Sequence, residues 1–408
     1  MSERVKRLLL IIGFLLSVFA IAALLYFAFF QPISSPPPPS SEPQPTTTTP
    51  GGLAPSAEGT PGIVTTPGVI PGLEAAAPVA NGGLTQTTEL TTAPVANPIL
   101  SGDGTSINFY DDADGKFYTI DANGNIQLLS DKTFPSVQNV AWNNNASKAI
   151  LEFPDGSNIV YDFDDETQVT LPKHWEDFDF SPVSDDVLAK SIGLDPNNRW
   201  LVLSNSAGSN VKTIQALGDS EAKVQVNWSP NDQVIAFSDT AEATGSFDRK
   251  TIIPLGKNKE NFKGLTVEGL GFASTWSPDG KQLLYSVSGA YSNYRPLLWV
   301  VDATSATMGE ERKSIPLNTW IDKCTFADST TVYCAVPQDL PPNAGLQRVI
   351  YENFPDSLYK VNLQTGATQL IAIPSEEKTM SNLFVTQNKD FLYYTNSATG
   401  NLEYIKLK

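Results

Sequence analysis

The sequence predicts an all-β fold, a β-propeller that most simply has seven four-stranded blades. Two observations predict it. A phrase of similar form recurs, as in "NWSPNDQVIAFS" (residues 227–238) and "TWSPDGKQLLYS" (residues 275–286). No long amphipathic helix is expected after residue 31, whereas short apolar segments bounded by turn residues occur throughout. We therefore expect most of the 408 residues to form one repetitive domain.

The repeated unit combines a leading apolar residue, a tight turn and an apolar strand. In the phrase led by Trp276, Pro278 fixes φ at a turn position and Gly280 tolerates positive φ, so a β-hairpin is predicted. The leading residues are Leu100, Trp142, Phe180, Trp228, Trp276, Phe326 and Phe384. Residues 99–408 then give about 44 residues per unit, which is typical of a propeller blade. Six or eight blades are the alternatives.

The last unit supplies only three expected strands before the chain ends at Lys408. The threonine-rich stretch 84–92, "LTQTTELTT", is strand-prone and lies before the first blade. We interpret it as the missing outer strand, because an unclosed ring leaves unpaired strand edges. The alternative is that it continues the segment before it. The predicted propeller domain is therefore 84–408.

The N-terminal region is predicted to anchor the chain in a membrane. Residues 8–30 contain no charge and would form about 35 Å of helix, enough for a single transmembrane span. Arg4, Lys6 and Arg7 precede this segment, so residues 1–7 are expected in the cytoplasm and the propeller outside it. Residues 31–83 are rich in Pro and Thr and are predicted to be a disordered stalk. A cleavable signal peptide is the alternative to the anchor.

The aromatic-Ser-Pro-Asp-Gly-Lys frame, seen best at residues 276–281, resembles the propeller repeats of TolB-like proteins. Similar repeats occur in prolyl oligopeptidase-type enzymes, whereas the Gly-His and Trp-Asp signatures of WD repeats are absent. The resemblance implies a propeller fold over residues 99–408. TolB-like proteins are periplasmic and bind protein partners, but they carry an additional N-terminal domain that this sequence does not show, so the family's particular partners do not transfer.

Long insertions are predicted on one face of the propeller. The segments 337–356, 288–296 and 239–249 each follow the second strand of a unit, and loops at that position share a face with the connections between blades. Aromatic and Arg side chains there are candidate binding residues. The candidates are His174, Trp175, Tyr291, Tyr294, Arg295, Arg348, Tyr351 and Phe354. The alternative is that these rings cover their own insertions.

Composition restricts the chemistry. The net charge is −17, which disfavours nucleic acid as a partner. With one histidine and two cysteines, a multi-histidine metal site cannot form, and we predict no metal site and no cofactor. The acidic stretch 111–125 reads as hairpin turns rather than a calcium loop. Cys324 and Cys334 are expected opposite each other in one hairpin, where they can form a disulfide; two buried thiols are the alternative.

These observations predict a membrane-tethered, extracytoplasmic binding or scaffold module for a protein, peptide or glycan. We predict that the chain is not an enzyme, because no Gly-x-Ser-x-Gly nucleophile elbow accompanies the propeller. The alternative is a glycan-directed hydrolase or lyase that uses paired carboxylates in the propeller's pocket.

Overall fold

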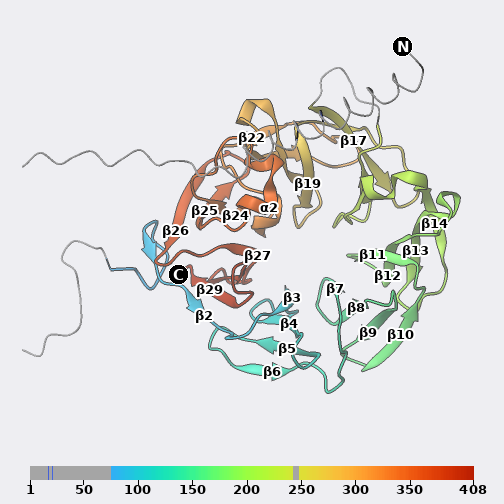
Figure 1. Ribbon diagram of the computed structural model, residues 1–408, viewed down its shortest axis with the longest axis horizontal. Coiled ribbons are helices and arrows are strands. Elements are labelled where there is room, and N and C mark those ends of the chain that lie inside the picture. Colours follow the sequence, from blue (N-terminus) through green and yellow to red (C-terminus); the bar gives the residue numbers. More distant parts are fainter. Residues whose placement is uncertain (1–16, 18–20, 22–74, 242–247) are drawn as a thin grey trace, which may run out of the picture. The chain divides into compact units, whose positions relative to one another are not determined.

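The computed structural model describes Ser17, Ile21 and residues 75–241 and 248–408. The two long ranges lie in one compact unit, Val69–Lys408, and form seven β-sheets around a common axis (Figure 1). Six sheets have four strands and one has five. The predicted all-β, seven-bladed propeller is confirmed.

The first four blades follow one another along the chain. Blade 1 contains β3 (Ala96–Leu100), β4 (Ile107–Asp111), β5 (Lys116–Ile120) and β6 (Ile126–Leu128). Blade 2 contains β7 (Asn139–Trp142), β8 (Lys148–Glu152), β9 (Asn158–Asp162) and β10 (Thr167–Leu171). Blade 3 contains β11 (Trp175–Phe180), β12 (Asp186–Ser191), β13 (Trp200–Asn205) and β14 (Lys212–Ala216). Blade 4 contains β15 (Val224–Val226), β16 (Val234–Ser238), β17 (Arg249–Gly256) and β18 (Leu265–Glu268).

The remaining blades include two strands from the beginning of the domain. Blade 5 contains β19 (Leu270–Trp276), β20 (Gln282–Ser288), β21 (Pro296–Asp302) and β22 (Lys313–Ile315). Blade 6 contains β23 (Cys324–Asp328), β24 (Thr331–Pro337), β25 (Asp356–Asn362), β26 (Thr368–Pro374) and β1 (Leu84–Thr85). Blade 7 contains β27 (Met380–Val385), β28 (Phe391–Asn396), β29 (Leu402–Lys406) and β2 (Thr88–Glu89). Within each blade the first strand lies nearest the axis.

The described helices are short, at most six residues, and lie in the connections between strands. They are η1 (Pro196–Asn198), η2 (Gly218–Lys223), η3 (Ala290–Ser292), η4 (Ile321–Lys323), η5 (Ala344–Leu346) and α2 (Arg348–Tyr351). Among the described residues, no helix is both long enough and apolar enough to cross a membrane. The predicted transmembrane span 8–30 and most of the stalk lie outside the described residues.

The repeated phrase forms the hairpin between the first two strands of a blade. Trp276 ends β19, and the Gly280 N–H donates to the Ser277 carbonyl oxygen at 2.8 Å. The Ser277 hydroxyl donates to Asp279 at 2.7 Å and accepts from the Gln282 N–H at 2.9 Å. Gly280 has φ +65°, which explains the glycine at this position.

The hydrophobic core is divided among the contacts between neighbouring blades. Phe180, Trp228 and Trp276, which lead three of the repeats, are only 4–7% exposed and belong to successive inter-blade clusters. The Trp276 indole N–H donates to the Asn227 carbonyl oxygen at 3.3 Å in the preceding blade. Each leading aromatic therefore joins blades rather than facing a ligand.

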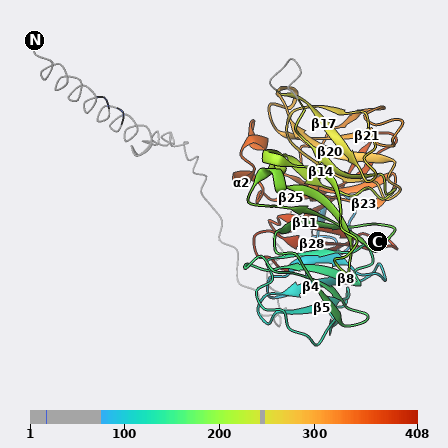
Figure 2. The same ribbon diagram turned by 90° about the vertical axis from the view of Figure 1, so that its right-hand side faces the viewer.

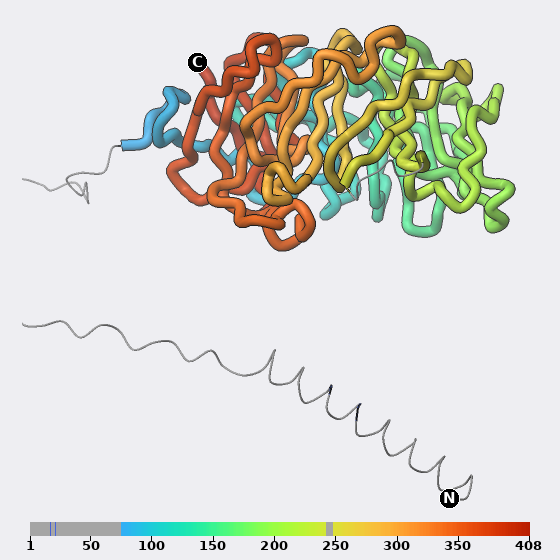
Figure 3. Tube along the Cα trace, turned by 90° about the horizontal axis from the view of Figure 1, so that it is seen from above, coloured from blue at the N-terminus to red at the C-terminus, as the bar shows by residue number. Residues whose placement is uncertain are grey.

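The ring closes through residues from both ends of the domain. Thr88 and Glu89 of β2 pair antiparallel with Tyr404 and Glu403 of β29, which gives blade 7 its fourth strand. Leu84 of β1 pairs parallel with Ile373 of β26. Figure 3 shows the blue N-terminal strands beside the red C-terminal blade.

Contacts with the propeller begin before residue 84. The Ala80 N–H donates to the Lys406 carbonyl oxygen at 2.9 Å, and the Gly82 N–H donates to the Ile371 carbonyl oxygen at 2.8 Å. Ala77 forms an isolated parallel bridge with Thr85. Residues 77–83, which composition assigns to the stalk, thus lie against blades 6 and 7.

Candidate functional site

Loops between second and third strands share one face of the propeller with the connections between blades, because adjacent strands run antiparallel. We call this the insertion face. Its longest described loop is the blade-6 insertion, residues 338–355, which carries η5 and α2. The blade-5 loop, residues 289–295, carries η3. Figure 2 shows α2 on one side of the ring.

The blade-6 insertion is fastened to the blade-5 loop by backbone hydrogen bonds. The Asn343 N–H donates to the Asn293 carbonyl oxygen at 2.8 Å, and the Gly345 N–H donates to the Tyr294 carbonyl oxygen at 2.9 Å. The Arg295 Nε donates to the Leu340 carbonyl oxygen at 2.6 Å. The two loops therefore form one continuous surface across blades 5 and 6.

Aromatic packing supports the insertion from below. Trp320, which is 6% exposed, packs with Leu340 and Ala344, and the rings of Tyr351 and Phe354 lie against this cluster. Tyr351 and Phe354 meet edge to face at a centroid distance of 5.3 Å. These contacts bury the aromatic side chains of the insertion and turn other side chains outward.

Arg348 locks the start of α2. Its guanidinium lies 5.4 Å from the centre of the Trp320 ring. It also donates to Asp322 at 3.0 Å and to Glu352 at 3.3 Å. Stacking and bidentate pairing are the interactions that arginine makes best, so this short helix has a fixed orientation.

The outward side of the insertion is apolar. Leu346 of η5 and Val349 and Ile350 of α2 are 48%, 81% and 61% exposed, and they lie close together in the chain. We call these three residues the apolar patch. Tyr291 of the blade-5 loop is also 45% exposed. Exposed apolar groups gathered on a rigid loop are characteristic of interaction sites.

A buried ion pair lies where the insertion ends. The Lys323 ammonium is 2.6 Å from Asp356, and their side chains are 2% and 0% exposed. The same Asp356 oxygen accepts from the Met380 N–H at 2.7 Å. Burial raises the pKa of Asp356 to about 6, although the lysine acts in the opposite direction. The pair ties the first residue of β25 to η4.

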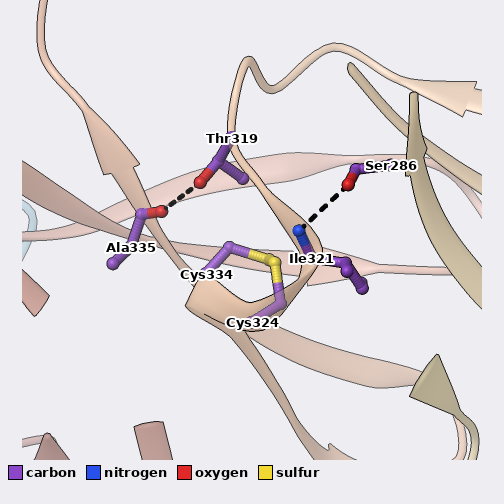
Figure 4. The surroundings of a disulfide bond; sticks show 6 residues. All are labelled: Ser286, Thr319, Ile321, Cys324, Cys334 and Ala335. Atoms are coloured by element: carbon purple, nitrogen blue, oxygen red, sulfur yellow. Dashed lines mark hydrogen bonds between the residues drawn. A yellow bond between two sulfur atoms is a disulfide. The ribbon is translucent and has the colours of Figure 1, made fainter. Parts of the chain in front are cut away.

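A disulfide holds the same region. Cys324 of β23 lies opposite Cys334 of β24, and the two are joined by a disulfide bond. Figure 4 shows the bond beside the connection that leads into β23. There the Thr319 hydroxyl donates to the Ala335 carbonyl oxygen at 2.6 Å, and the Ile321 N–H donates to the Ser286 hydroxyl at 3.2 Å. A disulfide and two hydrogen bonds therefore stabilise the base of the insertion.

The structure divides the predicted site residues into three groups. Tyr294 and Arg295 lie where the blade-5 loop meets the blade-6 insertion. Arg348 of the insertion donates to Asp322 of η4, and Tyr291 packs against Trp299 of β21. Tyr351 and Phe354 pack inward, as the alternative of rings that cover their own insertion expects.

His174 and Trp175 lie apart from these loops, at the junction of blades 2 and 3. His174 is exposed on the connection into β11. Trp175, predicted as a surface residue, is instead 5% exposed and belongs to the core between these blades. The reason is that Trp175 is the first residue of β11 and pairs with Ser191 of β12, so it belongs to the blade and not to the connection.

Sequence reasoning missed a polar cluster at the same end of the inner strands. The Asn97 amide donates to Asn139 at 3.0 Å, and the Asn139 amide donates to Glu152 at 2.6 Å. Burial raises the pKa of Glu152, with smaller contributions from Asp177 and Glu176. Asn97 and Asp177 both have positive φ at β-bulges. The available sequence signal for this cluster was the presence of an amide and an acidic residue, Asn97 and Asp177, within strands, where β-bulges redirect side chains.

No group of His, Cys, Asp and Glu side chains suited to a metal ion occurs in the described part of the chain. No protein-family model and no curated protein matches the sequence. Solved structures do resemble the propeller. An oligogalacturonate lyase in complex with manganese has a TM-score of 0.56 and 13% identity, covering 79% of this chain and 93% of that chain.

Two further structures give the same picture. Oligogalacturonate lyase from Vibrio parahaemolyticus has a TM-score of 0.55 and 12% identity over 79% of this chain and 93% of its own. The β-propeller domain of Cps50 (Swd1) from Myceliophteria thermophila has a TM-score of 0.50 and 11% identity over 79% and 100%. At these identities the similarity establishes a shared propeller fold; the TolB-like motif itself has no matching family model.

The prediction that the chain is not an enzyme is contradicted by these comparisons. Two of the similar structures, each matched over 93% of its length, are oligogalacturonate lyases. Fold alone does not assign the activity to this chain.

Proposed function

We propose that this propeller is a protein-binding module whose contact surface is the apolar patch on the blade-6 insertion. The observation that carries the proposal is the exposure of Leu346, Val349 and Ile350 on a segment braced by hydrogen bonds, stacking and a disulfide. A preorganised loop loses little conformational entropy on binding, and the exposed side chains of the apolar patch supply the contact area.

We further propose that the module is displayed outside the cytoplasm on a membrane tether. The uncharged segment 8–30 and the basic residues before it support this location. The disulfide supports an oxidising compartment.

The test cross-links the wild-type chain and two double variants to their partners in cells that express them, and compares the partners captured. Val349→Asp with Ile350→Asp places two charges in the apolar patch and is expected to abolish cross-linking to the partner. The matched control is Val183→Asp with Leu194→Asp, because these residues are 65% and 102% exposed on blade 3. A partner retained by the patch variant, or lost equally in both, contradicts the proposal.

A second candidate is carboxylate catalysis on a glycan. It is favoured by Glu152, whose raised pKa suits a proton-transferring group and whose amide neighbour Asn139 fixes its orientation. Glu176 and Asp177 add negative charge nearby, which disfavours a polyanion and favours a neutral oligosaccharide. Product formation from neutral oligosaccharides that persists in Glu152→Gln would rule out this role.

A further inference from the structure

The sequence contains two copies of the acceptor motif for N-linked glycosylation, in which Asn is followed by any residue except Pro and then by Ser or Thr. The copies are Asn145-Ala146-Ser147 and Asn227-Trp228-Ser229. Each copy lies in or beside the hairpin that joins the first two strands of a blade, blade 2 for the first and blade 4 for the second. The same motif can therefore be compared in two settings of one fold.

The second copy is committed to the contact between blades. The Asn227 Nδ2 donates to the Ser274 carbonyl oxygen of blade 5 at 2.9 Å and to the Ser274 hydroxyl at 3.2 Å. Trp228 and Ser229 are 6% and 0% exposed. A saccharide on Asn227 would break these hydrogen bonds and separate blade 4 from blade 5. The folded propeller therefore disfavours modification at Asn227.

The first copy is open to solvent. Asn145 is exposed in the turn between β7 and β8. Its Oδ1 accepts from the Ser147 hydroxyl at 2.9 Å, whereas its Nδ2 has no hydrogen-bond partner among the described residues. The side-chain nitrogen is the atom that carries the sugar in an N-linked glycan. The hydroxyl that the motif requires and an uncommitted amide nitrogen therefore lie together at the surface.

The surroundings of Asn145 leave space for an attached sugar. A hollow of about 410 Å³ lies between the hairpins of blades 2 and 3 and is lined by residues 143–145 and 180–185. The hairpin itself is held by Asn143, whose Oδ1 accepts from the N–H groups of Ser147 and Lys148 at 2.9 and 3.0 Å. These hairpins lie on the face opposite the insertion face, so a saccharide at Asn145 would leave the apolar patch uncovered.

We propose that Asn145 carries an N-linked saccharide and that Asn227 does not. The inference rests on the proposed display of the propeller outside the cytoplasm, where a transferase would use a polyprenyl-phosphate-linked saccharide as the donor. The bond between C1 of the sugar and the donor's phosphate oxygen breaks, and its electron pair leaves with the lipid phosphate. A bond forms between C1 and the Asn145 Nδ2, which loses one proton to the transferase.

The experiment maps the modification by mass spectrometry on tryptic peptides of the full-length protein, purified from the cells that naturally make it. The two copies of the motif fall on separate peptides, residues 133–148 and 224–249. We expect the modified fraction at Asn145 to be at least tenfold higher than that at Asn227. An unmodified Asn145, or equal modification of both sites, overturns the proposal.

Variants expressed in the same cells test the role of the motif. Ser147→Ala removes the hydroxyl and is expected to lower the modified fraction at Asn145 at least tenfold, whereas Ser147→Thr keeps a hydroxyl and should retain the wild-type fraction. Ser157→Ala is the matched control, because Ser157 lies in the next turn of the same blade and outside any acceptor motif. It should change the fraction less than twofold. Modification that persists in Ser147→Ala contradicts the proposal.

A reporter site separates failure of this inference from failure of the proposed function. Asn125→Thr creates a new acceptor motif at Asn123, which is exposed in the loop between β5 and β6. Modification of Asn123 without Asn145 would overturn the inference and leave the proposed display standing. Absence of modification at both sites would overturn the two together. The Val349→Asp, Ile350→Asp variant is expected to remain modified at Asn145, so loss of the partner in that variant leaves the inference intact.

Discussion

At the scale of single residues, Asp179 shows how a polar group can join two blades. It lies in the inner strand β11, where its carboxylate accepts from the Trp228 N–H and from its neighbour's Phe180 N–H, both at 2.9 Å. Burial raises the pKa of Asp179 to about 6, and the two hydrogen bonds offset only part of that effect. The contact therefore links blade 3 to blade 4, and the free-energy cost of burying its carboxylate depends on pH.

Replacement of Asp179 by Asn is expected to be less costly, relative to wild type, at neutral pH than in acid, because Asn does not ionise but has one oxygen where the carboxylate accepts two N–H groups. The unfolded carboxyl titrates near 4 and the folded one near 6, so the folded state holds the extra proton between these values. Wild-type stability therefore falls as pH rises through this window. Relative to wild type, Asp179→Asn should gain about 1–3 kcal/mol between pH 4 and pH 7 in denaturant unfolding.

The control for this prediction is Asp219→Asn, a change at an exposed aspartate. Its difference from wild type should be nearly constant between pH 4 and pH 7. A constant difference for Asp179→Asn as well would mean that burial does not perturb the Asp179 carboxyl.

Residue-level prediction from the sequence succeeded where local chemistry decides the outcome. Pro278 and Gly280 require a turn whatever surrounds them, and the cysteine spacing around a four-residue turn places Cys324 opposite Cys334. Trp175 was misplaced because its burial depends on where β11 begins. The surroundings of Glu152 depend on bulges in other strands, which the sequence around Glu152 itself does not reveal.

At the scale of elements, the blade-6 insertion depends on a close approach to β20. A Cβ added at Gly345 would lie 1.9 Å from the Ser288 hydroxyl oxygen and 2.8 Å from the Tyr294 carbonyl oxygen. Only glycine fits this contact. The sequence locates the insertion by its length and composition, but it cannot show that Gly345 meets Ser288, because the two residues belong to different blades.

Gly345→Val is expected to release the insertion without unfolding the propeller. Limited proteolysis should then cut within residues 338–355 at least tenfold faster than in wild type, while the unfolding temperature changes by less than about 3 °C, since most inter-blade packing is untouched. Gly83→Ala is the control, because its φ is not in the left-handed region and its added Cβ would make only an ordinary contact, 3.4 Å from the Asn81 side-chain oxygen. Unchanged cleavage of the insertion would show that it is not held by this contact.

At the scale of the whole domain, closure by β2 and β29 decides whether the seven blades behave as one unit. The Leu90 N–H donates to the Leu402 carbonyl oxygen at 2.8 Å, and the Thr91 hydroxyl accepts from the Leu402 N–H at 2.9 Å. Tyr393 of blade 7 donates to the Thr105 carbonyl oxygen of blade 1 at 3.0 Å. Blades 7 and 1 are thus joined by a side-chain hydrogen bond as well as by the chain that runs from β2 to β3.

Deletion of residues 75–91 is expected to lower the unfolding temperature by at least about 5 °C, because blade 7 loses its outer strand and exposes an edge. Thermal denaturation followed by circular dichroism measures the change. Deletion of residues 31–74 is the control and should shift the temperature by less than about 1 °C. Equal shifts would show that β1 and β2 contribute nothing specific to closure.

The placement of β2 also gives proteolysis two distinct outcomes. A cut upstream of Ala77 would leave the ring intact, because every strand of blades 6 and 7 stays with the C-terminal fragment. A cut between Glu89 and Ala96 would leave β2 held to the remainder by noncovalent pairing alone. The connection between β2 and β3 is therefore the place where a single cut would weaken closure of the ring.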